Sequence, residues 1–393
     1  IRTMRQRASE GAKAFKKKYP SARIEKVKIF GLGGSAAPHD IARGIIDCYQ
    51  KSGVEIEVVR SDTPNPDYID KNTLVVLASF SGNTEETINS YKIIKHKAKL
   101  SAAITKGGEL TGIADQNDIP LIQLPKNEDH PAYVLQPRES VCLQLTAILT
   151  FLASIGLKAG GNGRYSRSDI DFKRISELIR KWRNRFGPRQ PFKRNSAKQL
   201  AFFVLFGIKY KGGRPRPKFE PWSKRIPYII GDLNLRALVH EVATQFRERS
   251  KLNVAEGITP EDLHNTVESI RARIESAQAG VDDDPYVYMF IDSPDSERRI
   301  DFRVKKTREL VMGRKARYAV LTTEGDTSFE RALFLTYFNA HMTTYAALLN
   351  GFDPLPVPTM SWMKEVMKGY KRGSKAETEV INKRQNSLQI CEK

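Results

Sequence analysis

Short apolar runs alternate with helical patterns along the first part of the chain. The runs with the length and composition of strands are VKIF, VEIEVVR, TLVVLASF, SAAIT and IPLIQL. Helical spacing follows the first run, over residues 37–53, and the third, over residues 85–98. Strands that alternate with helices favour a doubly wound parallel sheet with helices on both faces. A long apolar helix over residues 139–157 closes this half of the chain.

A second alternation of the same kind begins at residue 226. Its strand-like runs are IPYIIG, PYVYMFID and RYAVLTT, with a helix expected over residues 235–251 and a long closing helix from Phe329. This rough repeat predicts an α/β fold with two similar parallel-sheet domains. The expected divisions are a first domain, a basic helix with an inserted loop, a second domain and a polar tail, at residues 1–160, 161–225, 226–370 and 371–393.

The positive charge is concentrated in one segment. The chain carries 65 Lys and Arg against 45 Asp and Glu, a net charge of +20, and residues 164–225 supply +15 of it. Within this segment, residues 207–224 alternate Lys and Arg with Gly, Pro and aromatic residues, which favours an exposed loop. Cations interleaved with aromatic rings also suit a nucleic-acid strand, so nucleic-acid binding by this loop is an alternative function.

The cysteines and the lengths of the apolar runs indicate the redox environment of the protein and whether it has a membrane-spanning helix. Cys48, Cys142 and Cys391 share no short spacing, so neither a disulfide framework nor a zinc site is expected, and a reducing cytoplasm fits. No apolar stretch approaches the roughly 20 residues that span a bilayer. The chain of 393 residues does not begin with Met, so its first turn is expected to be incomplete.

Hydroxyl side chains cluster where the third strand-like run ends. The stretch ASFSGNTEET carries Ser79, Ser81 and Thr84 around Gly82. Ligands of parallel sheets gather at the carboxyl ends of the strands, where free helix N–H groups favour an anion. A capped helix start needs only one such side chain, so several of them favour a phosphate site, with simple capping as the alternative.

A glycine loop, GLGGSA at residues 31–36, follows the first strand-like run. Gly31, Gly33 and Ala36, with Asp62 after the next run, partly match a dinucleotide fingerprint. A nicotinamide site does not require the serine-rich turn after the third run, so a sugar phosphate is favoured over a dinucleotide.

The two loops together resemble the sugar isomerase (SIS) domain, whose first strand ends in GGS and whose third ends in S-x-S-G-x-T. The resemblance implies two SIS-type domains of αβα layers and a site for the phosphate of a sugar. Such domains serve both enzymes and regulators. The residues implied to bind the substrate are Gly33, Gly34, Ser35, Ser79, Ser81 and Thr84.

Three further segments resemble the bifunctional phosphoglucose/phosphomannose isomerase family. The segment QFRERSKLNVAEGITPEDLHNTVESI contains F-x-E-x-x-K followed by P-E-x-x-H-N, QPRES contains P-R, and DPLPVPTMSWMK resembles the ending N-P-L-x-x-P…K. The resemblance covers roughly residues 27–364, apart from the basic insertion. It implies an isomerase without metal or cofactor that acts as a homodimer with shared active sites.

The resemblance also implies the roles of four side chains. Glu248 would be the base that moves a proton between C1 and C2 of the sugar, and Arg138 would stabilise the enediolate. His264 of the partner subunit would open the ring, with Lys364 assisting at the ring oxygen.

Position alone gives these residues ordinary explanations. Glu248 would lie about 200° around a helix from the apolar Phe246 at 100° per residue, so by itself it would be a solvated acid. Glu256 and Glu261 are rival bases, in a segment expected to be a loop that positions His264.

The implied activity is the interconversion of glucose 6-phosphate and fructose 6-phosphate in cytoplasmic carbohydrate metabolism. Val357 stands where family members with both activities carry Thr, which makes mannose 6-phosphate a less expected substrate. The alternative is a non-catalytic SIS sensor of phosphosugars that binds nucleic acid through residues 207–224.

Overall fold

The computed structural model describes residues 2–48, 54–126, 137–157, 170–206, 225–280, 284–313 and 316–368. The chain divides into two compact units, Ile1–Pro354 and Leu355–Lys393. The first unit contains both parallel sheets, and the described part of the second contains one helix, α12 (Pro358–Lys368). The domain divisions expected from the sequence stay predictions.

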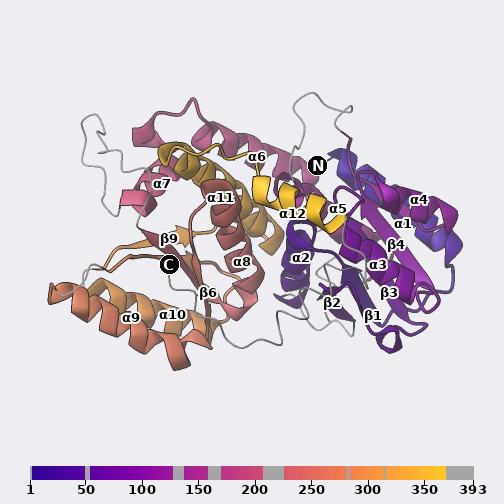
Figure 1. Cartoon of the computed structure of the whole chain (residues 1–393), viewed down its shortest axis with the longest axis horizontal. Coiled ribbons are helices and arrows are strands. Elements are labelled where there is room, and N and C mark those ends of the chain that lie inside the picture. Colours follow the sequence, from indigo (N-terminus) through magenta and orange to yellow (C-terminus); the bar gives the residue numbers. More distant parts are fainter. Residues whose placement is uncertain are drawn as a thin grey trace. The chain divides into compact units, whose positions relative to one another are not determined.

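The first sheet has five parallel strands in the order β2-β1-β3-β4-β5. Figure 1 labels β1, β2, β3 and β4 of this sheet. All five strands coincide with the expected runs to within two residues. Residues Thr73–Ser79 of the central strand are all buried, because helices cover both faces of a doubly wound sheet. The strands are β1 (Lys26–Phe30), β2 (Glu55–Val59), β3 (Thr73–Ser79), β4 (Leu100–Thr105) and β5 (Leu121–Gln123).

Alternate side chains of these strands point to two different hydrophobic clusters. Leu74 and Val76 of β3 pack with one layer of helices, and Val75 and Leu77 pack with the other. The period of two in a strand explains this division. The first layer consists of α1 (Arg2–Lys18), α2 (Ala37–Cys48) and α5 (Val141–Ser154), and the second of α3 (Glu85–Ile94) and α4 (Glu109–Gln116).

The second sheet has four parallel strands in the order β7-β6-β8-β9, which repeats the order of the first four strands of the first sheet. Its strands are β6 (Ile226–Asp232), β7 (Ala255–Thr259), β8 (Tyr286–Asp292) and β9 (Tyr318–Thr322). In Figure 1, α9 (Asp262–Gln278) and α10 (Arg298–Gly313) lie together on one face of this sheet. On the other face, α8 (Arg236–Gln245) and α11 (Ser328–Leu349) share a hydrophobic cluster with α2 and α5.

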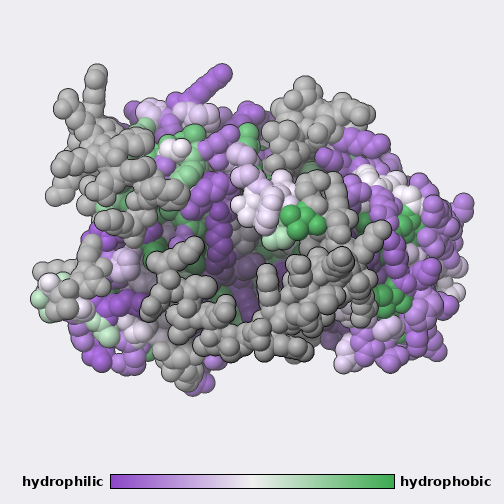
Figure 2. All heavy atoms as spheres, in the orientation of Figure 1, coloured by the Kyte–Doolittle hydropathy of each residue, from purple (hydrophilic) through white to green (hydrophobic). Residues whose placement is uncertain are grey.

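Two helices that lie between the two sheets in the sequence also contribute to this cluster. They are α6 (Phe172–Phe186) and α7 (Ser196–Phe206), and α6 contributes the fully buried Trp182 and Phe186. The ring of Phe186 packs against that of Phe338 in α11, with centroids 5.0 Å apart. The described surface in Figure 2 is mainly hydrophilic, with few exposed apolar side chains on the face shown. None of the helices in the described ranges is long and apolar enough to cross a membrane.

Several expectations about the second half were wrong. The helix expected over residues 235–251 ends at Gln245 and continues as a π turn, and the expected loop after it is in fact β7 followed by α9. AEGIT shows no clear alternation of apolar and polar residues, and three of its five residues are only partly buried, so periodicity did not reveal this edge strand. The sequence pattern also gave no prediction of α4, α7 or α10. The basic loop 207–224 and the polar tail lie outside the described residues.

A buried ion pair ties α11 to the end of β8. The Arg331 side chain donates two parallel hydrogen bonds to Asp295, and the two side chains are 11% and 9% exposed. Asp295→Ala is expected to lower the free energy of unfolding by about 3 kcal/mol, because a buried guanidinium loses its counter-charge. Urea denaturation followed by circular dichroism measures this loss.

Glu268→Ala is the matched control, since it removes an exposed carboxylate that pairs with Arg271 on α9. Its expected effect is below about 0.5 kcal/mol. A loss at Asp295 no larger than that of the control would contradict a stabilising role for the buried pair.

Candidate active site

The first glycine loop forms a tight turn against the segment that carries Arg138. Residues Gly33–Ser35 form a 3-10 turn that begins three residues after the end of β1 at Phe30. A Cβ atom added to Gly34 would lie 2.9 Å from Cβ of Pro137 and 3.1 Å from the backbone nitrogen of Arg138. Glycine at position 34 therefore allows a backbone approach that any side chain would block.

The second loop, between β3 and α3, also depends on a glycine. Gly82 has φ +75°, and an added Cβ would lie 1.6 Å from the carbonyl oxygen of Gly107. The N–H of Glu109 donates to Oδ1 of Asn83 at 2.9 Å, which joins this loop to the start of α4. These contacts fix the backbone conformation of the residues after β3, at the carboxyl edge of the sheet.

Two of the predicted phosphate-binding serines are buried and accept hydrogen bonds from the backbone of these loops. Ser35 and Ser79 are 4% and 0% exposed. The N–H of Phe80 donates to Oγ of Ser35 at 2.8 Å, which joins the two loops, and the N–H of Gly82 donates to Oγ of Ser79 at 3.0 Å. The other predicted hydroxyls, on Ser81 and Thr84, are half-buried, and Oγ1 of Thr84 lies 2.7 Å from Oγ of Ser79.

Arg138 lies next to the first loop and connects it to the second half of the unit. It belongs to a 3-10 turn, Pro137–Ser140, that leads into α5, and it is only 3% exposed. Its Nη1 donates to Oε2 of Glu248 at 3.3 Å, and its Nη2 donates to the carbonyl oxygen of Pro354 at 2.8 Å. The structure therefore brings together the two side chains that were predicted to be base and enediolate cation.

Glu248 lies on a π turn, Phe246–Ser250, that follows α8. A π turn rotates less per residue than the 100° of an α-helix, so the angle expected between Phe246 and Glu248 does not apply as stated. The Glu248 side chain is 35% exposed and pairs with Arg138. Single π turns of this kind occur frequently at functional sites.

The rival bases are placed differently. Oε2 of Glu256 lies 3.0 Å from Nδ1 of His240, and Oε1 accepts a hydrogen bond from Nη1 of Arg247 at 2.7 Å. Partial burial raises the pKa of Glu256, but the hydrogen bonds from His240 and Arg247 outweigh it, so the net pKa is lowered. Glu261 is exposed ahead of α9. Neither carboxylate contacts Arg138 in the described hydrogen bonds and ion pairs.

The other two predicted catalytic residues are located by backbone alone. His264 lies in the first turn of α9, and Lys364 lies in α12 of the second unit. Their side chains fall outside the described part of the structure, so their roles stay predictions.

The sequence pattern did not predict that Gln245 and Glu241 form a buried polar pair next to Arg138. Nε2 of Gln245 donates to the carbonyl oxygen of Arg138 at 3.4 Å and to Oε1 of Glu241 at 2.7 Å. Burial, and then the nearby charge of Glu248, raise the pKa of Glu241 to about 7 against the opposing hydrogen bond from Gln245. The available signal was a carboxylate on the apolar face of α8, three residues after the buried Leu238.

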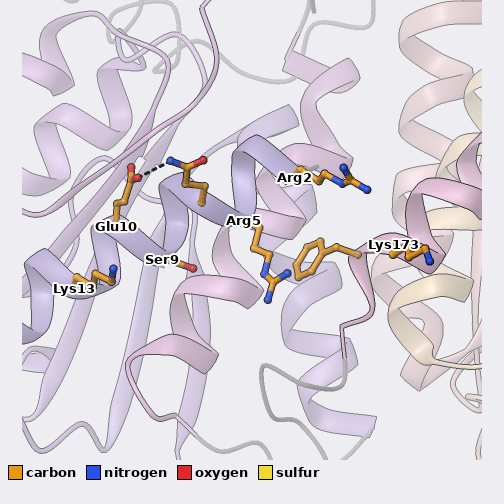
Figure 3. Close-up of a pocket in the computed structure, with 8 residues that line it drawn as sticks. Arg2, Arg5, Ser9, Glu10, Lys13 and Lys173 are labelled. Atoms are coloured by element: carbon orange, nitrogen blue, oxygen red, sulfur yellow. Dashed lines mark hydrogen bonds between the residues drawn. The ribbon is translucent and has the colours of Figure 1, made fainter.

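A separate groove lies along α1 and the start of α6 (Figure 3). It encloses about 650 Å³, and the Arg5 guanidinium lies 4.8 Å from the centre of the Phe172 ring. None of its lining residues belongs to the two glycine loops or to the Arg138–Glu248 pair. Its lining consists of Arg2, Arg5, Gln6, Ser9, Glu10, Lys13, Phe172 and Lys173.

Solved structures share this fold. A hypothetical protein from Thermus thermophilus superposes with a TM-score of 0.67 over 93% of this chain and 86% of its own, at 15% identity. The tagatose-6-phosphate ketose/aldose isomerase from Escherichia coli gives a TM-score of 0.56 over 87% of each chain, at 14% identity. At these identities the likeness concerns the fold, and the expected SIS-type α/β architecture, with two parallel sheets covered by helices, is confirmed.

Sequence comparisons extend the likeness over most of the chain. Residues 220–367 match the family described as the bacterial phospho-glucose isomerase C-terminal SIS domain. The bifunctional phosphoglucose/phosphomannose isomerase from Caldicellulosiruptor bescii is 26% identical over 349 residues, 88% of this chain and 91% of that protein. The protein of the same name from Aquifex aeolicus is 22% identical over 343 residues, 86% of this chain and 89% of its own. The resemblance of this chain to bifunctional phosphoglucose/phosphomannose isomerases is thereby confirmed.

Proposed function

We propose that the protein is an aldose–ketose isomerase that interconverts glucose 6-phosphate and fructose 6-phosphate. The observation that carries this proposal is the pairing of the buried Arg138 with Glu248, beside the loop at Gly33–Ser35. The names of the similar proteins favour the same activity over a non-catalytic sensor. Three cysteines without disulfide spacing support the cytoplasm as its place of action.

The pair has the parts that an enediol reaction needs. Glu248 takes the proton from C2 of the open-chain aldose, and the electrons of that bond form the C1–C2 double bond while negative charge moves to O1. Arg138 stabilises this charge. Glu248 then returns the proton to C1, and the proton of the O2 hydroxyl moves to O1 as the C2 carbonyl forms. The sum of these steps converts aldose to ketose without net gain or loss of protons.

The phosphate group is held, in this proposal, by the two glycine loops. Gly33 and Gly34 give access to backbone N–H groups, and the half-buried Ser81 and Thr84 supply hydroxyl donors. Ser35 and Ser79 do not contact the phosphate in this proposal. Their hydroxyl oxygens accept backbone hydrogen bonds and so fix the loop that presents the phosphate-binding groups. Neutral donors bind a phosphate monoester firmly enough for positioning while allowing release.

Glu248→Gln tests the base directly. The amide oxygen can still accept from Arg138, so the fold is expected to persist, while kcat falls by about 1,000-fold because no group can take the C2 proton. Proton NMR of glucose 6-phosphate incubated in D₂O measures both ketose formation and the loss of the C2 proton signal.

Glu256→Gln is the control for a rival carboxylate and is expected to leave C2 exchange intact. Retention of full activity in the Glu248 variant, or loss of exchange only in the Glu256 variant, would remove Glu248 as the base.

The proposal includes a homodimer in which His264 of one subunit serves the active site of its partner, with Lys364 beside the ring oxygen. Its support is the motif that spaces Glu248 and His264 sixteen residues apart. A Glu248→Gln subunit paired with a His264→Ala subunit would then contain one intact site. Unfolding and refolding the two inactive variants together is expected to restore about a quarter of wild-type activity, since half of the dimers are mixed and each has one working site.

Refolding each variant alone is the control and restores nothing. Absence of recovery in mixtures that demonstrably contain mixed dimers would show that each subunit uses its own histidine.

Glucose 6-phosphate is proposed as the preferred aldose. Val357 offers no side-chain hydrogen bond, so an epimer-specific hydroxyl contact is missing at this position. Val357→Thr is expected to raise kcat/KM for mannose 6-phosphate about fivefold relative to glucose 6-phosphate, which corresponds to one net hydrogen bond of about 1 kcal/mol. Coupled assays with the two epimers measure this ratio, and a Thr variant whose ratio equals that of the wild type would refute the assigned role.

A further inference from the structure

Lys251 has a backbone conformation that lysine rarely adopts. Directly after the π turn, it has φ 58° and ψ 31°, in the left-handed region, and its N–H donates to the carbonyl oxygen of Phe246. Glycine or asparagine is the usual residue at such a turn end, and other residues pay about 1 kcal/mol for the conformation. Among the described residues, Asp118 is the only other non-glycine residue with positive φ. A lysine in this strained backbone conformation suggests that its side chain has a functional role.

The lysine side chain folds back over the turn that carries Glu248. Its Nζ donates to the carbonyl oxygen of Glu248, and the residue is half-buried. The charged groups that act on it are Arg138, Glu248 and Asp353. Burial, and then the neighbouring Arg138 guanidinium, lower the pKa of Lys251, while Glu248 and Asp353 act in the opposite direction. Lys251 therefore lies against the backbone of the turn whose Glu248 carboxylate pairs with the Arg138 guanidinium.

We propose that Lys251 is a second cationic residue of the active site, which contacts the sugar oxygen that becomes negative during proton transfer. The proposal rests on the isomerase function. When Glu248 takes the C2 proton it becomes neutral, and its negative charge moves to O1 of the sugar. Lys251 and Arg138 keep their charges and then stabilise the oxygen in place of the carboxylate. The cations are positioned beforehand, so they need no rearrangement as the charge moves.

A purely structural role for Lys251 makes a different prediction. If the residue only closed the turn, glycine would close it better, because glycine pays no penalty at positive φ. Lys251→Gly thus separates the two roles: a structural residue would be replaced without loss, whereas a catalytic cation would not. Asp118→Gly is the matched control, with the same backbone change at φ 50° on an exposed residue at the end of α4.

The test measures stability and isomerase activity of these variants side by side. Lys251→Gly is expected to unfold at the same or a higher temperature than the wild type while its kcat falls by about 100-fold, as when one donor to a developing oxyanion is removed. Asp118→Gly is expected to keep wild-type activity at a similar melting temperature.

Lys251→Arg adds a readout that depends on charge. The ammonium has a lowered pKa, so wild-type activity should decline at alkaline pH as Lys251 loses its proton. A guanidinium stays protonated throughout this range. The Arg variant is therefore expected to retain activity within about tenfold and to move the alkaline limb of the kcat/KM profile to higher pH.

Each outcome decides one point. Wild-type activity in Lys251→Gly, or an alkaline limb that stays in place in Lys251→Arg, would overturn the role of Lys251 and leave the isomerase function intact. A wild-type protein that neither forms ketose nor exchanges the C2 proton would instead overturn the isomerase function on which the proposal rests.

Discussion

The ion pair between Arg138 and Glu248 is the interaction on which the candidate site depends. Arg138 follows the first sheet and Glu248 follows α8 of the second half, yet Nη1 and Oε2 lie 3.3 Å apart. A guanidinium that is 3% exposed pays a desolvation penalty that only well-placed acceptors offset. Glu248 and the Pro354 carbonyl are two such acceptors, so three distant segments of one unit must meet at this point.

The residues around the pair allow the first glycine loop and the end of α8 to contact the backbone of Arg138. Gly34 lets the first loop contact the backbone of Arg138, and Gln245 holds the carbonyl oxygen of Arg138 from the other side. Glu248 lies on the π turn after α8, and its carboxylate pairs with Arg138. Fold and chemistry are connected here, because the contacts that bury the guanidinium also fix it beside the carboxylate that is proposed to carry the proton.

The sequence predicted the first sheet well and the second less well, for physical reasons. Buried parallel strands such as β3 are continuous apolar runs, whereas the partly buried edge strand β7 carries Glu256 and lacks a clear period. The pairing of Arg138 with Glu248 was expected from resemblance to a family, not from spacing. No local pattern marks a π turn or the left-handed Lys251, because both depend on how α8 ends against its neighbours.

A crystal structure with a five-carbon aldonate phosphate bound would test the central claim most directly. The carboxylate of this molecule mimics the enediolate, and its phosphate mimics that of the substrate. The account predicts a carboxylate within hydrogen-bond distance of Arg138, Glu248 beside the adjacent carbon, and the phosphate on the loops at Gly33–Ser35 and Ser81–Thr84. A ligand bound with its carboxylate away from Arg138, or with its phosphate in the groove along α1 and the start of α6, would contradict it.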